Sequence, residues 1–248
     1  MRKAPNAERI RPQRDRRPCR REQHGKPIGA GVSDLARIVP YWSRNRLESR
    51  RRKIHDVGTL KPLEPIMSKI DTAVLSIDVQ QSFPQRDYWR EDDLPAFRSS
   101  IVKLIEGAAA KGWPVVRVLH EDGDGPFALA SGLVKPLEWM PDTHAVEFVK
   151  HVHNAFTDTG LDGWLRERGI RRLLVAGIRT EQCCETTTRV ASDLGYQVDF
   201  VSEATLTFPM TDPRSGRTFS AQDIRERTEL VLRDRFARIV TVDEALAV

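Results

Sequence analysis

In residues 172–187, RLLVAGIRTEQCCETT, an apolar run passes directly into a polar segment that carries two cysteines. The run is typical of a buried parallel strand, and the polar segment predicts a helix that begins with Thr180 as its N-cap. Cys183 then lies on the first helical turn, where unpaired backbone N–H groups and the helix dipole favour a thiolate. The stretch therefore predicts a strand–turn–helix junction that presents a nucleophile.

The two cysteines of this segment are predicted to have different roles. Free cysteines are common as small buried hydrophobic residues, and on this segment alone that interpretation of Cys183 stands equal to the catalytic one. Cys184 is rotated by about 100° around the helix. It shares a face with Thr187 and Ala191, which predicts packing on the sheet. We therefore expect Cys183 to be the nucleophile and Cys184 to be structural.

Two further predicted strands end in charged residues. TAVLSID, residues 72–78, ends in Asp78, and AVEFVK, residues 145–150, ends in Lys150. In parallel α/β sheets, ligands bind beyond the carboxyl ends of the strands. A lone charge at such an end is an ordinary residue that meets solvent. A carboxylate, an amine and a thiol at three equivalent places predict one common site instead.

Strand and helix patterns alternate along this part of the chain. Strands are expected near 72–78, 114–119, 145–149, 172–177, 197–202 and 237–241. Helices are expected near 94–112, 160–168, 181–195 and 221–234, with a short one after Thr241. The alternation predicts an α/β fold with a mainly parallel six-stranded sheet that is covered on both faces. The stretch 205–219 is too polar for a regular element and predicts a surface loop, with a lid or an intersubunit contact as alternatives.

Several groups of residues occur in the order and at the spacing typical of one family. They are Asp78-Val79-Gln80 with Phe83, Lys150 with Ala155-Phe156 and Thr159-Gly160-Leu161-Asp162, Gly177-Ile178-Arg179-Thr180 with Cys183, and Ala191, Gly195-Tyr196 and Glu203-Ala204. In these residues the chain resembles the isochorismatase-like cysteine hydrolases, over about residues 70 to 248. The resemblance implies a three-layer α/β/α, Rossmann-like fold, an Asp78–Lys150–Cys183 triad and a cis peptide bond between Ile178 and Arg179.

The resemblance also implies a hydrolytic reaction. Cys183 attacks an acyl carbon and forms a thioester, Asp78 transfers the proton, and Lys150 orients both. The backbone N–H groups of Arg179 and Cys183 are the candidates for the oxyanion hole. Several family members that cleave the vinyl ether of isochorismate lack the cysteine, so Cys183 favours hydrolysis of a C–N bond in a small amide-like molecule. Vinyl-ether hydrolysis is the alternative.

Four residues are expected to line the substrate pocket, namely Phe83, Trp89, His153 and Phe156, although core packing explains the aromatic residues equally well. His120-Glu121-Asp122, together with His151 and His153, suggests a zinc site as an alternative. Metal-dependent nicotinamidases of the family carry an Asp-x-His and a further His after the second strand, where this chain has only His120. We therefore expect a metal-independent enzyme without a cofactor.

Composition divides the chain into two parts. Residues 1–66 contain 18 Lys and Arg against 7 Asp and Glu, whereas residues 67–248 contain 22 against 28. Prolines and the lack of hydrophobic periodicity predict that residues 1–66 form a mostly disordered, basic N-terminal extension. One interpretation is an arm that binds nucleic acid or an anionic surface. We favour an upstream translation from a misassigned start codon, because Met67 is a natural start for the hydrolase domain.

The remaining expectations concern partners and location. Residues 67–248 suit one domain with a sizeable core. No apolar run approaches the ~20 residues that span a bilayer, and the three cysteines form no disulfide framework. We expect a cytoplasmic homo-oligomer that acts on a small-molecule substrate, with no membrane partner. An inert domain with a nucleic-acid-binding arm is the alternative from another class, but the presence of all three triad residue types argues against it.

Overall fold

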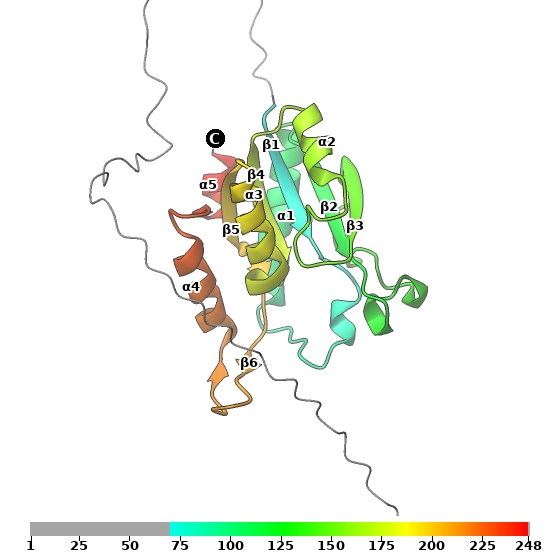
Figure 1. Ribbon diagram of the computed structural model, residues 1–248, viewed down its shortest axis with the longest axis vertical. Helices are drawn as coiled ribbons and strands as arrows, with labels where there is room; N and C mark the ends of the chain where they lie inside the picture. The colour runs from blue at the N-terminus through cyan, green and yellow to red at the C-terminus, as the bar shows by residue number, and fades with distance from the viewer. Residues whose placement is uncertain (1–69, 248) are drawn as a thin grey trace, which may run out of the picture. The chain divides into compact units, whose positions relative to one another are not determined.

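The computed structural model describes residues 70–247, which are built around one six-stranded sheet. Its strands are β1 (Thr72–Ile77), β2 (Val115–His120), β3 (Val146–Lys150), β4 (Arg172–Ile178), β5 (Gln197–Leu206) and β8 (Arg238–Val240). The order across the sheet is β3-β2-β1-β4-β5-β8, and all neighbouring strands are parallel. The chain winds outward from β1 to β3 and then from β4 to β8 on the other side (Figure 1). The winding direction therefore reverses between β1 and β4, where open α/β sheets bind their ligands.

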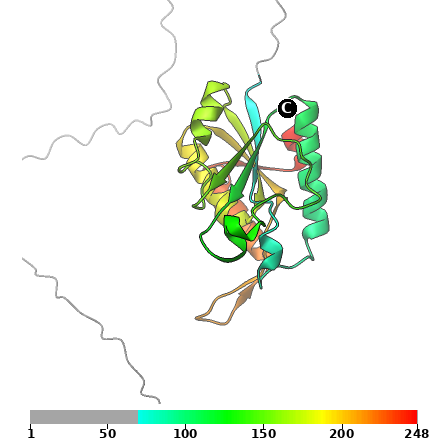
Figure 2. The same cartoon turned by 90° about the vertical axis from the view of Figure 1, so that its right-hand side faces the viewer.

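Helices cover both faces of the sheet. On one face lie α1 (Leu94–Ala110) and α5 (Val242–Leu246), and on the other lie α2 (Leu161–Glu167), α3 (Glu185–Asp193) and α4 (Ala221–Leu232) (Figure 1, Figure 2). Short 3-10 turns occupy Phe83–Gln85, Gly125–Phe127 and Leu129–Ser131. The three-layer α/β/α fold with a six-stranded parallel sheet, expected from the sequence, is confirmed.

Each face of the sheet has its own hydrophobic cluster. In α1, Phe97, Ile101 and Leu104 recur at helical spacing and pack on one face. On the other face, Leu161 and Leu165 of α2 do the same. All six residues of β1 are buried, because the strand has neighbours on both sides and helices above and below. Such burial explains why the central strands are continuously apolar in the sequence.

Gly177 in β4 allows a close approach of β4 to β1. Its φ is +132°, and a Cβ atom added to it would lie 2.0 Å from the carbonyl oxygen of Ile77. Any side chain at this position would therefore push the two strands apart. Because Asp78 follows Ile77 and the cysteine-bearing turn follows Ile178, this glycine brings the two segments together at the carboxyl edge of the sheet.

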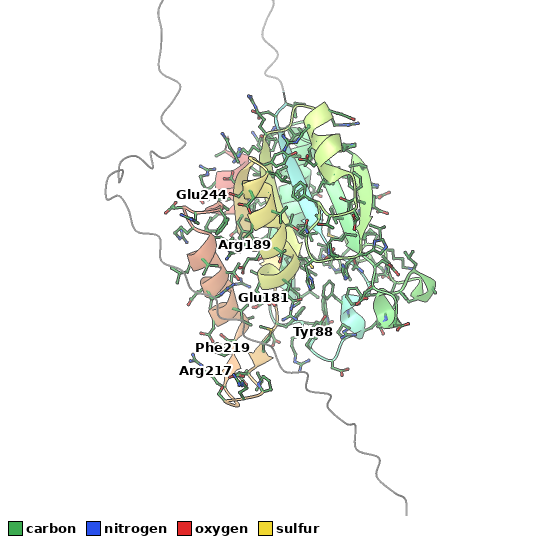
Figure 3. All side chains as sticks on the ribbon, viewed as in Figure 1. Tyr88, Glu181, Arg189, Arg217, Phe219 and Glu244 are labelled. Atoms are coloured by element: carbon green, nitrogen blue, oxygen red, sulfur yellow. The ribbon has the colours of Figure 1, made fainter. Side chains whose placement is uncertain are left out.

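The prediction of a surface loop without regular structure at residues 205–219 is wrong. The strand β5 continues to Leu206, and β6 (Met210–Thr211) pairs with β7 (Thr218–Phe219) in an antiparallel hairpin. The Asp212 carboxylate accepts hydrogen bonds from the backbone N–H groups of Arg214 and Ser215, which fixes the turn. Arg217 also lies over the Phe219 ring, with its guanidinium carbon 4.4 Å from the ring centroid (Figure 3). Polar residues therefore stabilise this hairpin.

Some sequence expectations fall on other parts of the chain. The predictions for residues 1–66, and for Met67 as the start of the domain, lie outside the described residues. Within residues 70–247, no helix is long and apolar enough to cross a membrane. Cys183 and Cys184 are both free thiols.

Candidate active site

The structure brings Asp78, Lys150 and Cys183 together at the carboxyl edge of the sheet. Asp78 directly follows β1, Lys150 is the last residue of β3, and Cys183 lies in the turn after β4. The Lys150 Nζ atom is 2.8 Å from Asp78 Oδ2 and 3.4 Å from Cys183 Sγ. All three side chains are buried. The ammonium group therefore joins the carboxylate and the thiol.

The turn that carries Cys183 differs from the expected first turn of an α-helix. Thr180–Cys184 is a π-helical turn, and α3 follows it directly. Thr180 is not the N-cap: Arg179 precedes the turn, and the Thr180 hydroxyl donates a hydrogen bond to Thr205 Oγ1 at 2.9 Å instead. The reason is that β5 extends far enough to offer Thr205 as a partner. The peptide bond between Ile178 and Arg179 is cis.

The expectation that the Cys183 thiol is biased toward thiolate is also wrong for this resting structure. Burial, and then the Asp78 carboxylate, raise the pKa of the Cys183 thiol, and the Lys150 ammonium offsets only part of this effect. Burial raises the pKa of Cys184 as well, in agreement with its predicted packing against the sheet. The sequence argument considered the helix terminus but not the loss of solvent around the sulfur.

Lys150 remains charged in spite of its burial. Burial lowers the pKa of Lys150, but Asp78 and Cys183 raise it by more, so the net shift is upward. A buried ammonium of this kind needs acceptors for its hydrogens. The side chain reaches them by passing the end of β2, which lies between β3 and β1 in the sheet.

The backbone at Asp78 adopts a left-handed conformation, with a φ of +54°. Aspartate tolerates this region better than most residues. The Asp78 N–H donates to the Val118 carbonyl oxygen at 2.8 Å, and the Asp78 carbonyl oxygen accepts from the Gln80 N–H at 2.9 Å. Its carboxylate atom Oδ1 is buried and has no hydrogen-bond partner among residues 70–247. One oxygen is thus held by Lys150, and the other is available to accept a proton.

A cavity of about 170 Å³ adjoins Cys183. Its lining residues come mainly from the loops after β1 and β2, and they are Asp78, Phe83, Arg86, Tyr88, His120, Asp122, Asp124, Phe127, His153, Gln182 and Cys183. Two of the four predicted pocket residues, Phe83 and His153, are therefore at the cavity. Both come from loops at the carboxyl edge of the sheet, as does the thiol.

The other two predicted pocket residues, Trp89 and Phe156, do not line this cavity. The Trp89 ring packs on Phe208, with ring centroids 5.2 Å apart, and Phe156 stacks on Tyr196 at 5.9 Å. Each ring covers a hydrophobic cluster, one on each face of the sheet. These contacts agree with core packing, the alternative interpretation of Trp89 and Phe156.

Sequence reasoning missed most of the polar residues at the cavity. Arg86 and Tyr88 follow the predicted Phe83 closely, and Asp122 and Asp124 follow the end of β2. The signal for them was their place directly after a strand that ends at the site. Loops have no periodicity, however, so the sequence could not show which of their side chains turn toward the cavity.

The Arg179 side chain is buried beside the site. Its Nη2 atom is 2.9 Å from Glu181 Oε1, and its guanidinium carbon lies 4.8 Å from the centroid of the Tyr88 ring (Figure 3 labels Tyr88 and Glu181). The Glu181 Oε2 atom in turn accepts a hydrogen bond from the Thr207 hydroxyl at 2.6 Å. These contacts hold the turn that carries Cys183 against Tyr88, an aromatic residue that lines the cavity.

The alternative of a zinc site finds little support in the donor residues. Within residues 70–247, no group of three or more His, Cys, Asp or Glu side chains is arranged to hold a metal ion. The Nδ1 atom of His120 lies 3.0 Å from the Lys150 ammonium, so that nitrogen already faces a cation. His151 is exposed and pairs with Glu121 at 3.0 Å.

Comparisons with known proteins agree with this architecture. The family model of the isochorismatase domain matches residues 72–241. The uncharacterized isochorismatase family protein YrdC of Bacillus subtilis (strain 168) is 28% identical over 183 residues, which cover 70% of this chain and 94% of YrdC. The streptothricin hydrolase of Streptomyces noursei is 30% identical over 146 residues, or 57% of this chain and 49% of that protein.

Solved structures of the same family have the same fold. A cysteine hydrolase from Pseudomonas syringae pv. phaseolicola 1448A superposes with a TM-score of 0.66 and 26% identity, covering 76% of this chain and 97% of that chain. A family hydrolase from Chromobacterium violaceum ATCC 12472 gives a TM-score of 0.67 and 25% identity, with 76% and 97% covered. The region matched by the family model is more than half of the chain and includes Asp78, Lys150 and Cys183. The chain therefore belongs to the isochorismatase family of hydrolases.

Proposed function

We propose that this protein is a metal-independent cysteine hydrolase that cleaves a C–N bond of a small amide-like molecule through a thioester on Cys183. The observation that carries the proposal is the buried Lys150 ammonium, which contacts both Asp78 Oδ2 and Cys183 Sγ beside a cavity. A nucleophile, a proton acceptor and an orienting cation are the groups that acyl transfer to sulfur requires. The cavity of about 170 Å³ suits a small substrate.

The raised pKa of Cys183 supports one order of proton movement in the proposed reaction. Burial and Asp78 favour the neutral thiol, and its proton leaves as the sulfur attacks the acyl carbon. The Asp78 Oδ1 atom, which has no partner among the described residues, accepts this proton while the new C–S bond forms. When the C–N bond breaks, Asp78 returns the proton to the departing amine.

Water completes the reaction by hydrolysing the thioester. A water molecule attacks the acyl carbon and gives a proton to Asp78, the C–S bond breaks, and the thiol recovers its proton. The Lys150 ammonium keeps its charge throughout and stabilises whichever of Asp78 and Cys183 is anionic. Its positive charge disfavours a metal cation in the same place, which supports a metal-independent reaction.

For the oxyanion of the tetrahedral intermediate we assign the backbone N–H groups of Arg179 and Cys183. The first N–H groups of a helical turn have no earlier carbonyl oxygen to bind, so they are suited to an anion. Support comes from the position of both residues, because Arg179 directly precedes the turn Thr180–Cys184 and Cys183 lies within it. A free thiol of this kind fits a reducing compartment, and the proposal therefore includes a cytoplasmic location.

Mass spectrometry of the intact protein tests the proposal. The full chain is incubated with a panel of small primary amides and quenched in acid, and the expected result is an added acyl mass on Cys183. Cys183→Ala should show no adduct, and Cys184→Ala should show the wild-type adduct. Activity should persist after dialysis against a chelator. Turnover of isochorismate without any acyl adduct would favour the vinyl-ether reaction and refute the proposal.

A further inference from the structure

The Lys150 ammonium has a third acceptor beside Asp78 and Cys183. Its Nζ atom lies 3.0 Å from Nδ1 of His120, the last residue of β2. An ammonium group carries three hydrogens and can only donate them. The three neighbours therefore take one hydrogen each, and Nδ1 of His120 must be an acceptor without a proton. In a neutral imidazole the ring proton then lies on Nε2.

The position of the His120 ring is fixed from its backbone outward. The Gln80 side chain is fully buried and binds both backbone groups of His120, donating to its carbonyl oxygen at 2.9 Å and accepting from its N–H at 2.7 Å. The same amide donates to Ser82 Oγ at 2.9 Å. The His120 ring also packs edge-on against Phe127, with ring centroids 5.9 Å apart. These contacts leave little freedom to the ring.

The second ring nitrogen of His120 faces a different environment. Nε2 has no hydrogen-bond partner within residues 70–247, and His120 lines the cavity beside Cys183. The two ring nitrogens of an imidazole point in different directions, so the Nε2–H group points away from the Lys150 ammonium that Nδ1 contacts. Because His120 lines the cavity, this group can donate to an acceptor of a bound molecule.

The charges around His120 favour its neutral form. Burial and the Lys150 ammonium lower the pKa of His120, and the nearby His153 contributes in the same direction. The carboxylates of Asp78 and Asp122 act in the opposite sense, but their effect is smaller. Protonation of Nδ1 would also place an N–H group against the Lys150 ammonium. The ring thus remains a hydrogen-bond donor through Nε2 and an acceptor through Nδ1.

We propose that His120 is a substrate-binding residue, which holds Lys150 through Nδ1 and presents Nε2–H to a hydrogen-bond acceptor of the substrate. The inference rests on the proposed amide hydrolysis and adds the chemical class of the substrate. The molecule carries a second acceptor, such as a carbonyl oxygen, apart from its scissile amide. An alkyl amide without such a group leaves the Nε2–H group unpaired in the cavity and binds less tightly.

Nitrogen NMR of the full chain with ¹⁵N-labelled histidine tests the tautomer without any turnover. The expected signals of His120 at neutral pH are a protonated Nε2 and an unprotonated Nδ1, assigned by their loss in His120→Gln. A proton on Nδ1, or an imidazolium at neutral pH, would overturn the inference. His153 provides an internal comparison, because it has no contact with Lys150 that fixes its tautomer.

Binding of two matched neutral amides tests the donor role. Succinamide has a second carbonyl group, and butyramide has the same chain length without it. We expect succinamide to bind about fivefold more tightly and to shift the Nε2 resonance, as one hydrogen bond would do. His120→Asn keeps an acceptor near Lys150 but has no donor at the Nε2 position, so the preference should disappear. His120→Gln places an amide N–H near that position and should retain part of it.

The outcomes separate this inference from the proposed function. An unchanged preference for succinamide in His120→Asn, or equal binding of the two amides by the wild type, would refute the donor role. If the tautomer and the preference are as expected but no amide ever acylates Cys183, the proposed hydrolysis fails alone. If Cys183 is acylated while His120 carries its proton on Nδ1, the inference fails alone.

Discussion

The Lys150 ammonium reaches Asp78 Oδ2 at 2.8 Å past the end of a strand to which neither residue belongs. Lys150 ends β3, Asp78 follows β1, and β2 lies between them. The long stem of Lys150 bridges this width while its charge stays buried. The contact makes the charge state of the site depend on Lys150. Removal of the Lys150 ammonium is therefore the most direct way to test the site.

Replacement of Lys150 by Met should raise the pKa of Cys183 further and abolish hydrolysis. The ammonium lowers the pKa of this thiol, and methionine keeps much of the apolar stem without the charge. The rate of alkylation by iodoacetamide, measured against pH, should move to higher pH than in the wild type. An alkylation profile that does not move would mean that Lys150 has no electrostatic effect on the thiol.

The same substitution leaves the Asp78 carboxylate buried without its partner, which costs about 3–5 kcal/mol of stability. The double variant Asp78→Asn/Lys150→Met removes both charges and is the matched control. It should recover much of the free energy of unfolding in urea but no hydrolysis. Equal stability of the single and double variants would contradict the ion pair.

Substitutions of the two adjacent cysteines should differ in their effects. Cys183→Ala should lose all turnover, because the sulfur at the cavity is removed while the fold is kept. Cys184 is fully buried, so Cys184→Ala should cost about 1 kcal/mol of stability and leave most of the activity. Initial rates and melting temperatures of both variants decide this, and the reverse pattern would assign the nucleophile to Cys184.

Gly177→Ala should destabilise the protein by about 3 kcal/mol, since both the positive φ and the contact with Ile77 oppose a side chain. Gly163 in α2 is the control, because a Cβ there meets nothing within 4 Å. Gly163→Ala should instead stabilise the helix by about 0.5–1 kcal/mol. Urea unfolding of the two variants should give shifts of opposite sign, and equal shifts would argue against the close approach of β1 and β4.

Asp199, near the amino end of β5, should make the free energy of unfolding depend on pH. Burial raises its pKa, but hydrogen bonds from Arg238 and Arg172 lower it by more, so the net shift is downward. A carboxyl with a lowered folded-state pKa stabilises the protein above its unfolded pKa of about 3.9, and this stability is lost as the pH falls through the folded value. Asp199→Asn should therefore cost about 3 kcal/mol at neutral pH.

The difference between the wild type and Asp199→Asn should narrow in acid, below about pH 4. Urea unfolding at a series of pH values measures it. Asp193→Asn, on an exposed position at the end of α3, provides the comparison and should change stability little at any pH. A constant difference between the wild type and Asp199→Asn across the whole range would show that the two arginines do not act through charge.

The sequence predicted the parts of the fold that depend on repeating patterns. The apolar runs at β1 and β4 gave strands at the expected places, and the helical spacing in α1 predicted its buried face. The carboxyl ends of β1, β3 and β4 also located Asp78, Lys150 and Cys183. Their meeting at one edge could be expected because all parallel strands end on the same side.

Other features depend on contacts between distant segments and could not be predicted. The hydroxyl of Thr180 binds Thr205 rather than a backbone group, so its role as a helix cap was a wrong inference from local pattern. The Cys183 pKa depends on burial by surrounding loops, which no local motif reports. For Trp89 and Phe156, the sequence showed large apolar rings but not whether a ring faces a cavity or a core.

Because of the contacts of Lys150, formation of the site reports when the sheet of the domain has folded. The partners of Lys150 lie 72 residues before it and 33 residues after it in the chain. No short segment contains all three side chains, and they meet only when strands on both sides of β1 have paired. Such long-range pairing is slow and cooperative. Protection of Cys183 from alkylation, followed during refolding, should therefore appear late and in step with the completed sheet, whereas the hairpin of β6 and β7 contributes nothing to that signal.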